Sequence, residues 1–165
     1  MMRLNFYRKF FLFIALLFSF SYLTSQNTSD RTFEELDTAK ISSLIDHAKK
    51  ISQEDADSAE IVFKEAVYFA ETGNSPEILT KAYYEYANFL FLRGRHEEAQ
   101  AKFLLCLSEA EKINSLRYMH LAKVFIGTVY MVKSNYNIAT KYAVEALEYF
   151  ESVEDYYWAA GILLN

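Results

Sequence analysis

Three alanines recur at a constant interval, from Ala59 to Ala99 and from Ala99 to Ala139. The residues after each alanine repeat with it, because mostly small or apolar side chains stand four, seven, eight and eleven positions later. These positions hold Phe63, Phe103 and Ala143; Ala66, Cys106 and Ala146; Val67, Leu107 and Leu147; and Ala70, Ala110 and Phe150. Offsets of 0, 4, 7, 8 and 11 lie on one face of an α-helix. The sequence therefore predicts a repeated unit that contains a helix with a face of small buried residues.

A second apolar stretch precedes two of these helices, over residues 77–92 and 117–132. Each stretch ends at a break, at 93–95 and at 133–135, so the predicted unit is helix, short turn, helix, longer turn. The chain has only four glycines and one proline, which is too few to punctuate an all-β sandwich or barrel. We therefore expect an all-α fold.

The third unit, IGTVYMVKSNYNIATKYAVEAL, resembles the tetratricopeptide repeat. Its matching positions are Ile126, Gly127, Tyr130, Tyr136, Ala139 and Ala146, with Ser134 where the family has a turn glycine. The second unit matches more loosely, at Ala87, Leu90, Gly94, His96, Ala99 and Cys106, and the first matches only in its second helix. The resemblance covers residues 36–165 and implies a right-handed α-solenoid of antiparallel helix pairs, with about three units and an incomplete fourth. The 40-residue period resembles that of sensory, often periplasmic, regions of bacterial two-component and transcription-regulating proteins.

The small residues predict close contacts between neighbouring helices, since helix axes approach within 8–10 Å only where side chains are short. Gly127 costs about 1 kcal/mol in helix propensity relative to alanine, a cost that close packing would offset. The aromatic side chains Phe63, Phe103, Tyr130 and Tyr136 are expected to fill the wider gaps between units. Ser75 is expected to cap a helix that begins at Pro76. The predicted packing residues are Ala59, Ala99, Gly127, Tyr130, Tyr136, Ala139 and Ala146.

The resemblance also implies a binding groove lined by the first helix of each unit. Mapped onto this chain, the groove consists of Lys81, Tyr84, Asn88, Phe91 and Leu92, followed by Leu121, Val124, Phe125, Thr128 and Met131. Some family members hold a peptide's terminal carboxylate with lysine and asparagine, and only Asn88 fits that arrangement. An apolar groove suits an amphipathic helix or an aliphatic peptide, and packing within the chain is the alternative.

The N-terminal segment differs from the rest of the chain. Arg3, Arg8 and Lys9 precede an apolar run over residues 10–23, which is followed by small and polar residues. This order is typical of a secretory signal peptide, and the 14 residues of this run are fewer than the roughly 20 that span a bilayer. We expect a signal peptide over residues 1–25, a linker over 26–35 and the repeat domain over 36–165. An uncleaved membrane anchor at residues 10–23 is the alternative.

The C-terminal stretch DYYWAAGILLN predicts the start of a further helix, apolar where a solenoid end is normally polar. We expect the chain to be a fragment of a longer polypeptide; a hydrophobic lid or pairing with another copy is the alternative. A net charge of −5 argues against a dedicated nucleic-acid binder. The three histidines stand apart from one another and Cys106 is the only cysteine, so no catalytic, metal or cofactor site is predicted.

Two functions fit these features. The first is an exported repeat scaffold that binds a protein or peptide and has no chemistry of its own. The alternative is the extracytoplasmic sensor part of a larger bacterial signalling protein, a histidine kinase or a helix-turn-helix regulator, whose output domain lies outside this sequence. Either would place the chain in the periplasm or on the inner membrane of a Gram-negative bacterium.

Overall fold

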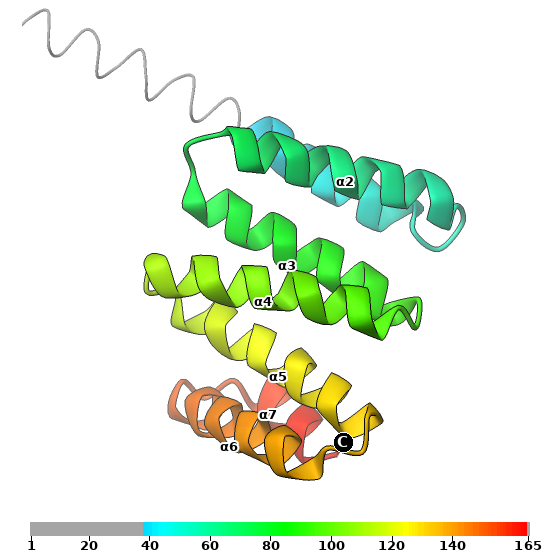
Figure 1. Cartoon of the computed structure of the whole chain (residues 1–165). Coiled ribbons are helices and arrows are strands. Elements are labelled where there is room, and N and C mark those ends of the chain that lie inside the picture. Colours follow the sequence, from blue (N-terminus) through cyan, green and yellow to red (C-terminus); the bar gives the residue numbers. More distant parts are fainter. Residues whose placement is uncertain (1–37, 165) are drawn as a thin grey trace, which may run out of the picture. The chain divides into compact units, whose positions relative to one another are not determined.

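The computed structural model describes residues 38–164, so the predicted signal peptide and linker lie outside the described residues. Seven helices follow one another in this part of the chain, which contains no strand (Figure 1). The first covers residues 38–51, and the others are α2 (Ala56–Thr72), α3 (Pro76–Leu92), α4 (His96–Lys112), α5 (Leu116–Val132), α6 (Tyr136–Ser152) and α7 (Tyr156–Leu163). The prediction of an all-α fold built from helix pairs is confirmed.

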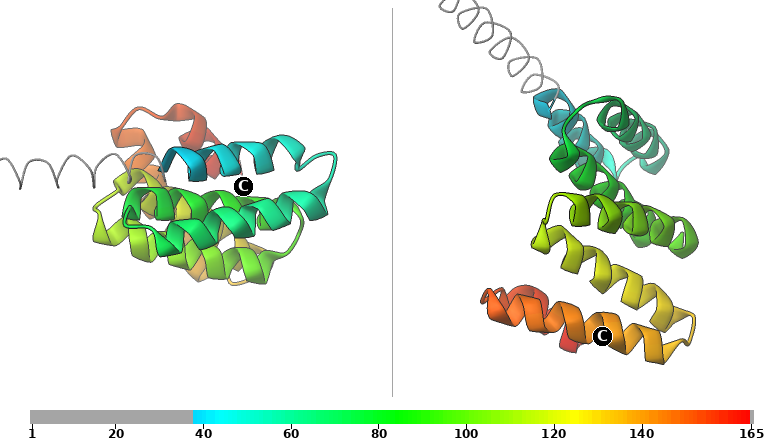
Figure 2. Two further views of the ribbon diagram at one scale, coloured as in Figure 1. Left: turned by 90° about the horizontal axis from the view of Figure 1, so that it is seen from above. Right: turned by 60° about the vertical axis from the view of Figure 1, so that its left-hand side comes forward.

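Each helix from α2 onward packs against the next one in the chain, as the two views of Figure 2 also show. In addition, α3 contacts α5, so the first helices of neighbouring units are themselves neighbours. Within residues 38–164 no helix combines the length and the apolar character needed to cross a bilayer.

The helices are evenly spaced along the chain. The five helices α2 to α6 each have 17 residues, and three-residue turns join them. Two such helices and two such turns make up the 40-residue period. The prediction of a longer turn between units was therefore wrong: both turns are equally short, and the extra length relative to a 34-residue repeat lies in the helices.

Four of the turns share one backbone conformation. Their middle residues, Gly94, Asn114, Ser134 and Glu154, all have positive φ angles, between 53° and 73°. In each turn the next residue's N–H donates to a carbonyl five positions earlier, as from Arg95 to Leu90 at 3.0 Å. This left-handed ending satisfies carbonyls that the last helical turn leaves free.

The turn between α2 and α3 is different. Gly73 is extended there, with φ −82° and ψ 175°, and α3 begins at Pro76 as predicted. Ser75 occupies the N-cap position, but its side chain forms no cap hydrogen bond, so the predicted capping role was wrong. Its hydroxyl lies 3.4 Å from a carboxylate oxygen of Glu77 instead.

The repeated alanines lie in the core. Ala59 and Ala99 are fully buried and Ala139 is 8% exposed. Gly127 belongs to the same contact between α5 and α6: a β-carbon there would lie 3.1 Å from Tyr142 Cβ and 3.3 Å from the Ala139 carbonyl oxygen. Neither atom is the end of a flexible side chain, so the helices at this point are too close for any residue but glycine to fit without a shift.

The larger side chains fill the spaces between these contacts. Phe63, Phe103 and Ala146 are at most 2% exposed, and Tyr130 stacks on Tyr142 with 6.1 Å between the ring centroids. The predicted packing role of Tyr136 was wrong, because this residue is 62% exposed.

The exposure of Tyr136 has a physical reason in the repeat. The equivalent residue on α4, His96, packs edge-on against the ring of Phe91 at 5.2 Å. The equivalent of Phe91 in the third unit is Met131, which has no ring for Tyr136 to pack against.

A polar network ties α2 to α3 and to the turn before α4. Glu60 on α2 accepts hydrogen bonds from Arg95 at 2.6 Å and from the Tyr86 hydroxyl at 3.1 Å, and it pairs with Lys64 at 2.9 Å. The hydrogen bond from Arg95 is the main reason why the pKa of Glu60 falls to about 2. The carboxylate therefore stays charged in the folded protein well below its ordinary pKa.

The shared turn conformation gives a first prediction. We expect Ser134→Gly and Glu154→Gly each to stabilise the protein by about 0.5–1 kcal/mol, because L-residues with side chains are strained at positive φ. Gly94→Ala should destabilise it by a similar amount. Urea unfolding monitored by circular dichroism measures these changes. Asn114→Gly is the control and should change the stability less, since asparagine tolerates this conformation. Destabilisation by Glu154→Gly would contradict the prediction.

Candidate functional site

The predicted groove residues lie on the first helices, but they differ in exposure. Tyr84 and Leu121 are buried, at 8% and 4% exposed, so their side chains pack within the chain. Leu92 is 69% exposed. The half-buried members are Lys81, Asn88, Phe91, Val124, Phe125, Thr128 and Met131. The predicted groove residues thus differ in exposure, from buried to exposed.

Several of these residues belong to an aromatic cluster with Phe125 on α5 at its centre. Phe125 stacks on Phe103 of α4, with 4.8 Å between the centroids and an interplanar angle of 3°. It also contacts Phe91 at 5.2 Å, Trp158 at 6.0 Å and Tyr84 at 6.1 Å. The cluster connects α3, α4, α5 and α7, so Phe91 and Phe125 hold the units together.

Burial raises the pKa of Tyr84 far above its ordinary value. The phenol is therefore neutral at physiological pH and contributes packing rather than charge to the face.

The polar residues lie toward the N-terminal end of the groove. Lys81 reaches Ser42 of the preceding first helix, at 3.5 Å. Asn88 lines a small cavity of about 150 Å³ together with Lys49, Glu85 and Arg93. Lys49 is paired with Glu85 at 2.9 Å.

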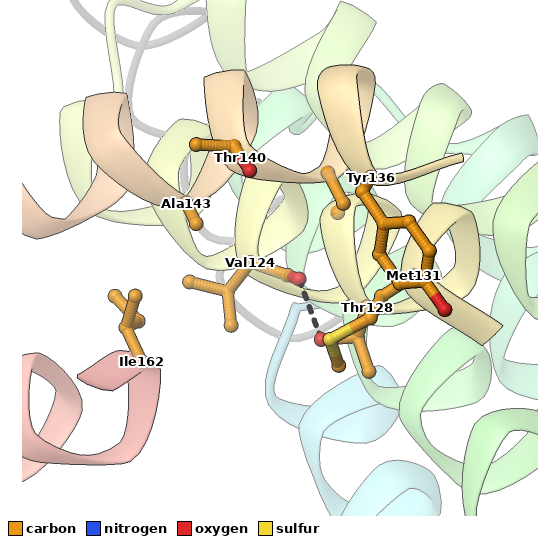
Figure 3. A pocket seen from close by; sticks show the side chains of 9 residues that line it. Val124, Thr128, Met131, Tyr136, Thr140, Ala143 and Ile162 are labelled. Atoms are coloured by element: carbon orange, nitrogen blue, oxygen red, sulfur yellow. Dashed lines mark hydrogen bonds between the residues drawn. The ribbon is translucent and has the colours of Figure 1, made fainter. Parts of the chain in front are cut away.

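A larger cavity, of about 270 Å³, lies between α5, α6 and α7 (Figure 3). Its lining consists of Val124, Gly127, Thr128, Met131, Tyr136, Ala139, Thr140, Ala143 and Ile162. No member of this lining carries a charge. The Thr128 hydroxyl donates to the Val124 carbonyl at 2.9 Å, so its hydrogen is already used.

This cavity combines residues that the sequence assigned to two different roles. Val124 and Thr128 were predicted for the groove, whereas Gly127, Tyr136 and Ala139 were predicted for packing. Sequence reasoning missed Thr140, Ala143 and Ile162 as lining residues. The available signal was Ala143, an alanine at the repeat position where both earlier units have a phenylalanine.

The residues with reactive side chains are dispersed. Cys106 is fully buried, and its burial raises the pKa of the thiol to about 12, so it remains protonated at neutral pH. Among residues 38–164 no group of three or more His, Cys, Asp or Glu side chains is placed to hold a metal ion.

His120 is the histidine with the most distinctive surroundings. Its ring stacks on Tyr149 of α6 with 4.3 Å between the centroids, and its Nδ1 atom is buried without a hydrogen-bond partner. Burial, and then the positive charge of Lys123, lower the pKa of His120 below its ordinary value. Lys123 is itself paired with Glu145 at 2.7 Å.

Two of the solved structures with similar folds contain tetratricopeptide repeats. The repeat domain of Arabidopsis FLU superposes with a TM-score of 0.64 and 18% identity, over 70% of this chain and 98% of that one. A signal-transduction ATPase from Pyrococcus horikoshii with a tetratricopeptide-repeat sensor superposes with a TM-score of 0.65 and 14% identity, over 74% of this chain and 20% of that one. BtubC from P. vanneervenii superposes with a TM-score of 0.54 and 20% identity, over 73% of this chain and 58% of that one. The fold of residues 38–164 is thus that of a tetratricopeptide-repeat solenoid.

No protein-family model matches the sequence, and no curated protein sequence matches it. The likeness to the solved structures is therefore one of fold, at identities of 20% or less.

The environment of His120 predicts how stability depends on pH. A histidine whose pKa is lowered by folding takes up its proton more readily in the unfolded chain, so the free energy of unfolding falls as the pH drops below about 6.5. His120→Phe preserves a ring opposite Tyr149 and removes the titration. We expect this variant to lose less stability than the wild type between pH 7 and pH 5. The slopes of the unfolding free energy against pH should differ by no more than the uptake of one proton accounts for. Urea unfolding at several pH values measures it, and equal slopes would contradict the prediction.

Proposed function

We propose that this protein is a binding scaffold that takes up a protein or peptide segment along its first helices. The observation that carries the proposal is a repeated feature of that face. Leu92 and Val132 occupy equivalent positions in successive units, at the ends of α3 and α5, and they are 69% and 56% exposed. Beside them stand the half-buried apolar residues Phe91 and Met131. Two adjacent helices thus offer the same apolar edge, which suits an amphipathic helix or an aliphatic peptide.

A direct test uses peptides selected from a random library for binding to the full chain. We expect Leu92→Glu and Val132→Glu each to weaken the selected peptides at least tenfold, because a carboxylate would have to be desolvated in an apolar contact. Ile61→Glu is the matched control: it changes a 66% exposed apolar residue on α2, a second helix, and should alter affinity less than twofold. Titration calorimetry measures the affinities. Peptides that lose affinity only with Ile61→Glu would overturn the proposal.

A sensor role within a larger signalling protein is the second candidate. It is favoured by the fold similarity to a signal-transduction ATPase whose repeat region is described as a sensor and which this chain matches over only 20% of its length. In that case the same groove would hold the signal, and a different segment would carry the output.

We also propose that the protein is exported, with residues 1–25 as its signal peptide. The support is the order of charged, apolar and small polar residues in this segment. Expression in a Gram-negative host followed by intact-mass spectrometry of the periplasmic fraction tests the proposal. A chain that has lost the N-terminal segment up to about Ser25 is expected. A full-length chain in the membrane fraction would support the anchor at residues 10–23, and a full-length chain in the cytoplasm would contradict export.

A further inference from the structure

The small cavity of about 150 Å³ lies between the C-terminal ends of two neighbouring first helices, residues 38–51 and α3. Its apolar lining consists of Phe63 and Phe89, which are at most 5% exposed, and of Leu92, which is 69% exposed. Leu92 also belongs to the apolar edge of the proposed groove. The small cavity is therefore continuous with the face along which we propose that a peptide binds.

A carboxylate stands in this cavity where the next unit has a ring. Glu85 on α3 is the equivalent of Phe125 on α5. Phe125 stacks on Phe103 at 4.8 Å, and the equivalent of Phe103 in the first unit is Phe63. Glu85 pairs with Lys49 at 2.9 Å instead. The later junction between first helices is thus filled by rings, whereas the earlier one keeps a space beside a ring and lines it with charged and polar groups.

Arg93 lines the same cavity and has no carboxylate partner within residues 38–164. Its guanidinium donates to the carbonyl oxygen of Ser52 and lies over the ring of Phe89, with 5.5 Å to the centroid. The other two arginines of this part of the chain, Arg95 and Arg117, pair with carboxylates at 2.6 Å and 2.8 Å. A guanidinium has five N–H donors in a planar arrangement, and a carboxylate can accept from two of them at once. Arg93 therefore retains donors that suit a carboxylate.

The equivalent of Arg93 in the next unit is engaged differently. Lys133, just after α5, donates to Gln100 at 3.0 Å and pairs with Glu97 at 3.5 Å, both on α4. Arg93 reaches the turn after the preceding first helix instead, through its hydrogen bond to Ser52. Its positive charge consequently lies at the small cavity and is not used to join two helices by an ion pair.

The charges of the lining favour an anionic group. Lys49 and Arg93 are positive and Glu85 is negative, so the lining carries one net positive charge. A carboxylate would bring this sum to zero, whereas a further cation would raise it. The half-buried amide of Asn88 also lines the cavity, has no hydrogen-bond partner among the described residues, and can donate to the same group.

We propose that Arg93 and Asn88 bind the side-chain carboxylate of an aspartate or glutamate in the peptide held along the first helices. This inference rests on the proposed function and adds a polar anchor to the apolar contacts at Leu92 and Val132. A cavity of about 150 Å³ accommodates benzene in another protein, so the methylene groups of an acidic side chain fit beside Phe63. The partner is then a segment whose acidic residue lies toward the first helix of the chain and whose apolar residues lie toward α5.

The first test uses peptides selected from a random library for binding to the full chain and synthesised with amidated C-termini. Their side chains then supply their only carboxylates. We expect an aspartate or glutamate whose replacement by asparagine or glutamine weakens binding about fivefold or more, because a charge-assisted hydrogen bond is lost. Titration calorimetry measures the affinities, and the factor should decrease at high salt. Binding that survives the replacement of every acidic residue would overturn the inference. Peptides that bind only with a free C-terminal carboxylate would overturn the assignment to a side chain.

Variants then tie the effect to the cavity. Arg93→Gln should abolish the difference between the acidic peptide and its amide counterpart, because the interaction is then absent from both. Arg93→Lys keeps the charge without the planar donors, should give an intermediate difference, and serves if the glutamine variant does not fold. Lys50→Gln is the matched control: it removes a positive charge from the same helix as Lys49, outside the cavity lining, and should leave the difference unchanged. Equal effects of Arg93→Gln and Lys50→Gln would overturn the inference, since net charge would then explain them.

The same measurements separate this inference from the proposed function. Peptides that lose affinity with Leu92→Glu and Val132→Glu but bind Arg93→Gln like the wild type would overturn only the acidic anchor. Peptides that depend on Arg93 and not on Leu92 or Val132 would support the anchor and overturn the apolar edge. If no peptide is selected, both are overturned. Self-association of the full chain that Arg93→Gln abolishes, measured by analytical ultracentrifugation, would assign the site to a second copy and overturn the assignment to a peptide.

Discussion

The close contact of helices at small side chains is the constraint on which the rest of the structure depends. Ala59, Ala99 and Ala139 let each second helix lie against its first helix, and Gly127 brings α5 so near to α6 that a β-carbon would lie 3.1 Å from its neighbour. These contacts set the separation of the helices, and the separation determines where rings fit. The aromatic cluster around Phe125 fills the wider spaces that remain.

Most of the fold could be predicted from the constant spacing of the alanines, because burial on a helix repeats with a fixed phase and small residues mark the contacts. The turn lengths could not. Positive φ angles occur at Asn114, Ser134 and Glu154 as well as at Gly94, and of these residues only glycine and, less strongly, asparagine indicate that conformation in a sequence. A serine and a glutamate can be held there because the helices on both sides fix the path of the chain. The predicted cap at Ser75 failed for a related reason, since a residue type favours a cap but the local geometry decides whether the bond forms.

The candidate site was predictable in its location and less so in its details. Assigning residues to the first helices identified Val124 and Thr128, which line both the groove and the larger cavity. It could not distinguish Tyr84 and Leu121, which are buried, from Leu92, which is exposed, because that difference depends on how far the next helix overlaps the face. The substitution of a ring by Ala143 was visible in the sequence. Only the structure shows where such a ring packs: Phe103 of the preceding unit stacks on Phe125 of α5, which is the first helix of the next unit.

Because the helices and turns are evenly spaced, the packing of the repeats depends on the length of each helix and each turn. From α2 to α6, every step from the start of one helix to the start of the next is equally long, and every junction after α3 has the same backbone conformation. A single residue inserted within a helix would rotate everything beyond it by about 100° and turn the small-residue face away from its neighbour. The gain or loss of one complete unit would leave every junction unchanged. Evolution of such a chain therefore proceeds most easily by whole units.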